Sequence, residues 1–196
     1  MAILSLALFP VFVFLPLIRL KFSGSIGTMI NKVLGQELPK NLSLYKIIEV
    51  LNKVKAEYPD LGLIVIDYLQ LVKPPLQSGG RNWSLIVGEI VRELRDLAGE
   101  LDVPIILLSQ LNRSVESRDN KRPMMSDLRD SGNIEEFADA VVFLYRDEYY
   151  NPDQAEENGT KGVVEIIFAK QRKGPIGTVK LRFIKEYTRF IDEFIE

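Results

Sequence analysis

Polar residues directly follow two aliphatic runs, at the points where strands of a sheet would end. Asp67 follows "LIVI" at 63–66, and Ser109-Gln110 follows "IILL" at 105–108. In open α/β sheets, ligands bind outside the carboxyl ends of the strands. A carboxylate there can hold Mg²⁺ beside a nucleotide, and an amide can orient a water or sense a γ-phosphate because it both donates and accepts hydrogen bonds. One acidic residue after four aliphatics is also a common helix cap or solvated strand end, so Asp67 alone leaves both interpretations open.

The composition restricts the chemistry that this chain can carry. Its 196 residues include no cysteine and no histidine. Disulfides, Cys/His zinc sites, thiol nucleophiles and Ser-His mechanisms are therefore excluded, and carboxylates, Lys, Arg, hydroxyls and a bound Mg²⁺ remain. Hydrophobic residues make up 46% and charged residues 27%, which is a globular balance. The net charge is −2, so a contact with nucleic acid must come from local basic patches.

The order of the expected elements predicts an α/β domain with helices packed on a mostly parallel sheet. Apolar spacing predicts a helix over 42–58, a second helix capped by Ser84, and a short helix over 134–138. The segment 112–132 has no apolar period and is long for a loop in a compact domain, which marks it as functional or mobile. Aliphatic runs predict strands at 61–66, 103–108, 141–145, 163–169 and 178–184, the last two forming a C-terminal β-hairpin.

The N-terminal segment differs from the rest of the chain. Residues 2–18 carry no charge and are followed by Arg19 and Lys21. Their length is at the lower edge of what spans ~30 Å of hydrocarbon, and Pro10 and Pro16 would kink a helix. Three interpretations stay open: a membrane anchor, a foreign or mis-started N-terminus, and an apolar strand pair in the core. The expected division is an apolar leader at 1–22, a linker at 23–41 and one domain at 42–196.

Three separated motifs resemble, in order and spacing, the C-terminal ATPase domain of the DnaB-type replicative DNA helicases, which are RecA-like ring motors. The motifs are "LIVIDYLQL" at 63–71, "IILLSQLNRSVESRDNKRPMMSDLRDSGNIEEFADAVVFLYRDEYYNP" at 105–152 and "AKQRKGP" at 169–175. The resemblance covers roughly residues 42–192. It implies a RecA-like, mostly parallel sheet flanked by helices, in a domain that is incomplete here.

The resemblance also implies roles for individual residues. Asp67 would be the Walker B aspartate that binds Mg²⁺ beside ATP, and Gln110 would couple the γ-phosphate to the DNA loops. Lys170 and Arg172 would reach into the ATP site of the neighbouring subunit, with Arg172 as the finger. Without the resemblance, "KQRK" at 170–173 would be taken as a solvated hairpin turn. The positions that match the family's DNA-lining residues are Arg113, Arg129, Asp130 and Gly132.

The chain departs from the family pattern in four places. No segment has the form G-x-x-x-x-G-K-[ST], in which backbone amides and a Lys cradle the phosphates; "GSIGT" at 24–28 lacks both the Lys and the spacing. The acidic residue that polarises the attacking water has no counterpart. Asp130 stands where the family usually has Glu, and Phe137 replaces a usual acidic residue. The sequence thus resembles the C-terminal part of a motor domain without its nucleotide cradle.

The sequence predicts part of an ATP-dependent replicative DNA helicase motor, in which hydrolysis of ATP with Mg²⁺ drives translocation on single-stranded DNA and duplex unwinding. The chain alone is expected to be inactive because it lacks the P-loop. Expected partners are single-stranded DNA, further copies in a ring of six, and a primase or helicase loader, in the cytoplasm. The rival interpretation is a non-catalytic, P-loop-less RecA-like module for DNA binding or ring assembly. A membrane contact would rest on residues 2–18 alone.

Overall fold

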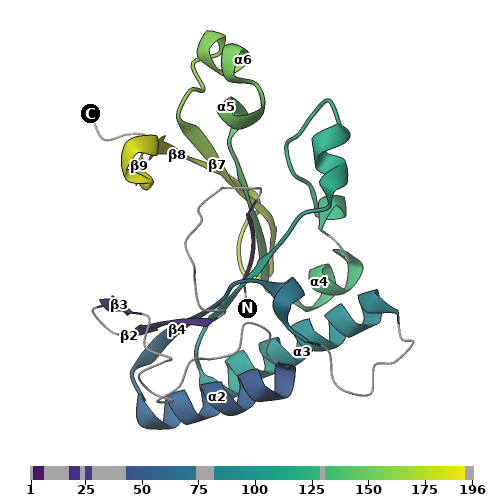
Figure 1. The fold of residues 1–196 in the computed structure, drawn as a ribbon, viewed down its shortest axis with the longest axis vertical. Helices are drawn as coiled ribbons and strands as arrows, with labels where there is room; N and C mark the ends of the chain where they lie inside the picture. The colour runs from purple at the N-terminus through teal and green to yellow at the C-terminus, as the bar shows by residue number, and fades with distance from the viewer. Residues whose placement is uncertain are drawn as a thin grey trace.

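A computed structural model of the chain describes residues 2–6, 18–22, 25–27, 43–73, 82–128 and 131–192 (Figure 1). The described strands are β1 (Ala2–Leu6), β2 (Ile18–Phe22), β3 (Ser25–Gly27), β4 (Leu61–Ile66), β5 (Ile105–Ser109), β6 (Ala140–Tyr145), β7 (Val163–Gln171), β8 (Gly177–Ile184) and β9 (Arg189–Asp192). The described helices are α2 (Leu44–Glu57), α3 (Trp83–Leu101), α4 (Ser131–Phe137), α5 (Asp147–Tyr150) and α6 (Pro152–Glu157), with 3₁₀ turns η1 (Leu69–Leu71), η2 (Arg113–Ser117), η3 (Met125–Asp127) and η4 (Lys185–Tyr187).

All described strands belong to one sheet in the order β3-β2-β4-β5-β1-β6-β7-β8-β9. The four central strands, β4, β5, β1 and β6, run parallel to one another. Antiparallel strands extend the sheet on both sides, with β2 beside β4 and β7 beside β6. The α/β fold class predicted from the sequence is confirmed, and the parallel part forms the centre of the sheet.

Each long helix begins at a polar side chain that satisfies a free backbone N–H group. The Ser43 hydroxyl accepts a hydrogen bond from the Lys46 amide at 3.3 Å, where α2 begins. The cap of α3 is Asn82, whose side-chain oxygen accepts from the Ser84 amide at 3.0 Å. The prediction that Ser84 caps this helix was therefore wrong by two residues, because an Asn preceding Ser84 offers the same kind of acceptor.

The hydrophobic core lies between the helices and one face of the sheet. Figure 1 shows α2 and α3 lying together along the strands, and α4 beside α3. Alternate residues of the central strands face these helices and are fully buried, as alternation along a strand requires. They are Ile64, Ile66, Ile105, Leu107, Val141 and Phe143, each 0% exposed.

The N-terminal segment contributes two strands to this sheet. β1 lies between β5 and β6, where Ala2 pairs with both Ile106 and Ala140, and β2 pairs with β4. Among the three interpretations of residues 2–18, these pairings support strands in the core. Pro10 and Pro16 lie outside the described residues. The boundaries predicted at residues 22 and 42 stay a prediction. Within the described part of the chain, no helix is both long enough and apolar enough to cross a bilayer.

The C-terminal part holds one more strand than the sequence indicated. β7 and β8 form the predicted hairpin, and β9 adds a third antiparallel strand through the pairing of Phe183 with Phe190. The run "RFID" of β9 is short, and three of its four residues are exposed, so it lacks an aliphatic signal. The polar stretch after β6 folds into the short helices α5 and α6.

Because β1 is paired on both sides, a proline within it should destabilise the fold. Ile3→Pro removes one ladder N–H group and leaves a buried acceptor without a partner, at a cost of about 1–3 kcal/mol. We expect a melting temperature lower by roughly 2–4 °C for each kcal/mol, measured by circular dichroism. Ile3→Val keeps the backbone N–H group and is the control, and it should lower the melting temperature less than Ile3→Pro. Equal melting of the two variants would mean that β1 is not held in the sheet.

Candidate functional site

Asp67 and Gln110 lie at the carboxyl ends of neighbouring parallel strands, β4 and β5. Asp67 is half-buried and Gln110 is exposed. Gln70, in η1, ties the two ends together. Its side-chain amide donates to the Ser109 hydroxyl at 3.1 Å, and its side-chain oxygen accepts from the Gln110 amide at 3.4 Å. The structure therefore brings together the two strand tips that the sequence singled out.

Sequence reasoning missed Gln70. The signal available was an amide side chain three residues after Asp67, within an otherwise apolar "YLQLV". A neutral side chain that donates and accepts at once can join a hydroxyl on one strand end to a backbone amide. Gln70 thus positions the turn after Asp67 relative to Gln110.

The donor set at this edge fits a magnesium nucleotide only in part. Mg²⁺ keeps several waters and takes one or two protein carboxylates together with substrate phosphates, so a single Asp67 is sufficient on the protein side. Among the described residues no group of three or more Asp or Glu could hold a metal ion by itself. The 196 residues contain no P-loop segment to hold the phosphates. Asp67 would be the magnesium ligand, and the phosphate cradle would have to be supplied by other residues.

Lys170 and Arg172, at the end of β7, contact the C-terminal end of α4. The Lys170 ammonium donates to the carbonyl oxygen of Glu135, and the Arg172 guanidinium donates to that of Glu136. The Arg172 side chain also lies 3.8 Å from a carboxylate oxygen of Asp139. Partial burial lowers the pKa of Lys170, and the positive charge of Arg172 lowers it further. The pair thus caps a helix end whose last carbonyls have no partner within the helix.

The basic pair is far from Asp67 within one chain. The register places Lys170 opposite Val141, and through β1 and β5 this row of the sheet continues to Ile66. Four inter-strand spacings of about 4.8 Å separate them, roughly 19 Å. Arg172 lies still further away, beside Asp139. Neither cation reaches the Asp67 site of its own chain.

Three of the basic residues between β5 and α4 hold that segment in place. Arg118 makes two hydrogen bonds, of 2.8 and 2.9 Å, to the buried carboxylate of Asp127. Arg122 pairs with Glu165 of β7 at 2.8 Å. Lys121 donates to backbone carbonyl oxygens of this segment. The sequence did not distinguish these three residues from the other basic residues of the segment. In the structure their contacts stabilise the segment that contains η2 and η3.

The predicted DNA-binding residues fall into two groups. Arg113 begins η2 and is exposed, and within the described residues its side chain makes no hydrogen bond or ion pair. Gly132 lies in the first turn of α4, where a Cβ atom would meet open space. Arg129 and Asp130 lie outside the described residues. Arg113 is therefore an exposed cation on a segment that its neighbours hold rigidly.

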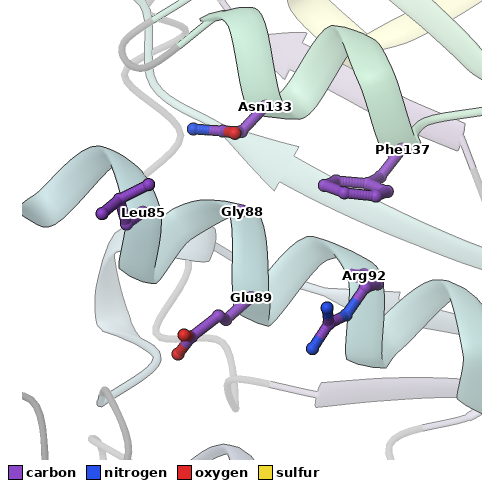
Figure 2. A pocket seen from close by; sticks show the side chains of 6 residues that line it. All are labelled: Leu85, Gly88, Glu89, Arg92, Asn133 and Phe137. Atoms are coloured by element: carbon purple, nitrogen blue, oxygen red, sulfur yellow. The ribbon is translucent and has the colours of Figure 1, made fainter.

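Helix α4 packs across α3. The side-chain amide of Asn133 donates to the Ser84 carbonyl at 2.9 Å and hydroxyl at 3.0 Å. A Cβ atom on Gly88 would approach the Asn133 side chain to 3.0 Å, so any larger residue there would require this side chain to shift by a few tenths of an ångström. Phe137, at the position where an acidic residue was expected, is half-buried. A pocket of about 280 Å³ lies between the two helices. It is lined by the six side chains labelled in Figure 2: Leu85, Gly88, Glu89, Arg92, Asn133 and Phe137.

The parallel strands, with an acid and an amide at adjacent tips, define a RecA-like α/β domain. The family model described as the DnaB-like helicase C terminal domain matches residues 26–192, and the chain belongs to this family. The match begins at residue 26, within the segment that the sequence predicted as a linker. The resemblance inferred from three motifs is confirmed.

Known relatives and structures agree with this family. The chain is 49% identical over 175 residues to the replicative DNA helicase DnaB of Geobacillus stearothermophilus, and 47% identical over 175 residues to the replicative DNA helicase DnaC of Bacillus subtilis. These alignments cover 88% of the chain and 37% of each relative. A solved ATPase domain superposes with a TM-score of 0.70 at 44% identity, covering 78% of this chain and 52% of that one. A DnaB-like replicative helicase, solved to describe its interactions with primase, gives a TM-score of 0.69 at 44% identity, covering 78% of this chain and 35% of that one.

The two arginines of the η2 segment should differ in their effect on stability. Arg118→Ala leaves the Asp127 carboxylate buried and without its ion pair, at a cost of about 3 kcal/mol. Arg113→Ala removes an exposed side chain and should stay within about 0.5 kcal/mol of the parent. Urea unfolding followed by fluorescence of the single tryptophan, Trp83, measures both. If the two variants unfold at the same urea concentration, the Arg118–Asp127 pair does not stabilise the fold.

Proposed function

We propose that this chain is the C-terminal part of an ATP-dependent replicative DNA helicase motor that works as a ring of subunits. Family membership supports the helicase class, and the relatives carry that activity in their names. The observation that carries the ring is the distance of roughly 19 Å between the strand of Asp67 and Lys170. Because the basic pair cannot serve its own Asp67, we infer that it acts on the site of another copy.

The proposed roles come from the family resemblance, and the positions of the residues are compatible with them. Asp67 binds Mg²⁺, and Gln110, held to the neighbouring strand end through Gln70, interacts with the γ-phosphate. Lys170 and Arg172 approach the same phosphate from the adjacent subunit, where Arg172 stabilises the charge that develops during hydrolysis. The bound ATP and Mg²⁺ supply the phosphoryl transfer, and a P-loop outside these 196 residues holds the phosphates.

The proposed DNA contacts are electrostatic. Arg113 is exposed at the start of η2, and Arg129, Asp130 and Gly132 match family positions that line the channel. Cations on such a wall bind the phosphates of a single strand without reading its bases. Translocation and duplex unwinding follow if the contacts move with hydrolysis around the ring. A primase is a candidate partner because a structural relative was solved to describe its interactions with primase.

A non-catalytic role in DNA binding or ring assembly is the second candidate. It is favoured by one observation, the lack of any G-x-x-x-x-G-K-[ST] segment in the 196 residues. The two functions can be distinguished by joining this chain to a P-loop segment in one polypeptide. The joined protein should hydrolyse ATP under the helicase proposal and should not hydrolyse it under the alternative.

Mixed rings test whether the basic pair acts on a neighbouring subunit. In a polypeptide that joins these residues to a P-loop segment, Asp67→Ala and Arg172→Ala should each lower ATP hydrolysis, the latter by roughly 10³- to 10⁵-fold. Mixing the two variants should restore part of the activity, because an intact Asp67 then faces an intact Arg172. Lys173→Ala removes an adjacent exposed charge and is the control, with unchanged turnover. Mixed rings as inactive as the single variants would contradict action in trans.

Single-stranded DNA binding tests the role of Arg113. Arg113→Ala should weaken binding to every sequence alike and lower the slope of log K against log salt by about 0.7 for each phosphate that the side chain binds. Lys53→Ala, on an exposed position of α2, is the control and should bind as the parent does. Fluorescence anisotropy over a salt series on the assembled form measures the slope. A base-specific decrease, or no decrease, would remove Arg113 from the DNA channel.

A further inference from the structure

Strand β1 fills the slot between β5 and β6 and runs in the same direction as both. Ser5 pairs with Ser109 of β5 and with Phe143 of β6, and Leu6 pairs with Leu144. The carboxyl end of β1 therefore lies at the same edge of the sheet as the ends of β4 and β5, which Asp67 and Gln110 follow. Across β5, this end of β1 is two inter-strand spacings from β4, about 10 Å.

A phosphate cradle at this edge needs a parallel strand to carry it. In a P-loop, the segment G-x-x-x-x-G-K-[ST] directly follows a strand, and its backbone N–H groups and Lys surround the phosphates. The same nucleotide has to reach Asp67 with its Mg²⁺ and Gln110 with its γ-phosphate. The other neighbour of β4 is the antiparallel β2, whereas β5 has β1 as its second parallel neighbour. The slot of β1 is thus the place beside Gln110 from which a P-loop reaches both residues.

The chain places a strand in this slot without a cradle after it. Residues 7–17, which follow β1, include no glycine, lysine, serine or threonine. These are the residue types on which a P-loop depends. The solved ATPase domain described above is matched over 52% of its length, and the unmatched part is large enough to hold a strand with such a loop. The slot is therefore filled by a strand that lacks the chemistry its position calls for.

Strand β1 can leave the sheet without opening any other described pairing. Among the described strands it pairs with β5 and β6 alone, and the pairings of β4 with β5 and of β6 with β7 do not involve it. The packing of α4 on α3, where Asn133 donates to Ser84, would keep the two halves of the sheet together. Only Ile3 among the five residues of β1 is β-branched. A strand richer in Val and Ile would therefore suit the slot better.

We propose that β1 is an exchangeable placeholder, and that its slot is the docking site for a partner segment made of an aliphatic strand followed by a P-loop. The segment replaces β1 between β5 and β6 by strand exchange, in which main-chain hydrogen bonds supply the affinity. This inference rests on the proposed function, because a P-loop is needed only if the Asp67 edge binds a magnesium nucleotide. MgATP binds the exchanged form alone, through the new cradle and Asp67, and therefore favours exchange.

A reversible disulfide across the slot tests the exchange, because the chain has no cysteine of its own. Leu4→Cys/Val142→Cys links register partners of β1 and β6, whose Cα atoms are about 5 Å apart, within the range that a disulfide bridges. The probe is a fluorescein-labelled synthetic peptide in which a strand rich in Val and Ile precedes G-x-x-x-x-G-K-T. By fluorescence anisotropy, the parent and the reduced variant should bind the peptide, more tightly with MgATP. The oxidised variant should lose this binding, and dithiothreitol should restore it.

Two controls isolate the slot. Arg182→Cys/Ile191→Cys places a disulfide between β8 and β9, and this variant should bind the peptide in both redox states. A peptide with a proline in its strand should bind none of the proteins, because it cannot complete the ladder. If circular dichroism shows that Leu4→Cys/Val142→Cys does not fold, Ala2→Cys/Ala140→Cys gives the same test at another register pair with a smaller change in volume.

The outcomes separate the exchange from the proposed function. Equal binding by the oxidised and reduced forms, or no binding by the reduced form, overturns the exchange. ATP turnover by the polypeptide joined to a P-loop segment would still support the proposed function in that case. Binding that the disulfide blocks, but that MgATP does not strengthen, supports the docking site and contradicts the nucleotide role of the Asp67 edge.

Discussion

The parallel pairing of β4, β5, β1 and β6 is the constraint on which the rest of the structure depends. The strand interiors are aliphatic because they are buried. Parallel strands point their carboxyl ends the same way, so the polar residues that follow them gather at one edge of the sheet. Asp67 and Gln110 lie together for this reason. The same pairing sets the row of the sheet that runs from Ile66 to Lys170. The candidate site residues are thus placed by backbone hydrogen bonds, and side-chain contacts such as Gln70 to Ser109 adjust them.

The sheet is wide enough to separate two groups of candidate site residues, one at β4 and β5 and the other at the end of β7. The first group is the acid Asp67 and the amide Gln110, which suit a magnesium nucleotide. The second group is the cations Lys170 and Arg172, which are bound to the end of α4. A single copy cannot bring them together, whereas in the ring proposed above the cations of one copy would lie against the acid and the amide of the next. Under that proposal, assembly is a condition of activity.

The sequence predicted the strand tips and the long helices well, because an aliphatic run that ends on Asp67 and an apolar stripe on α2 are local patterns. It could not separate Arg113 from Arg118. Both are arginines in one loop, and only the fold brings the Asp127 carboxylate under Arg118. Nor could it place β1, whose partners are distant in the chain. The contacts of Lys170 and Arg172 with α4 are to backbone carbonyls, which have no signature in side-chain types.

The position of β1 has a consequence for how the chain folds. Ala2 pairs with Ile106 and with Ala140, so the centre of the sheet requires segments more than about 100 residues apart to meet. Non-local pairing of this kind slows folding, because loop closure costs entropy before any contact forms. Until β1 inserts, β5 and β6 each present an open aliphatic edge that can recruit strands from other molecules. Aggregation during refolding should therefore compete with the insertion of one five-residue strand.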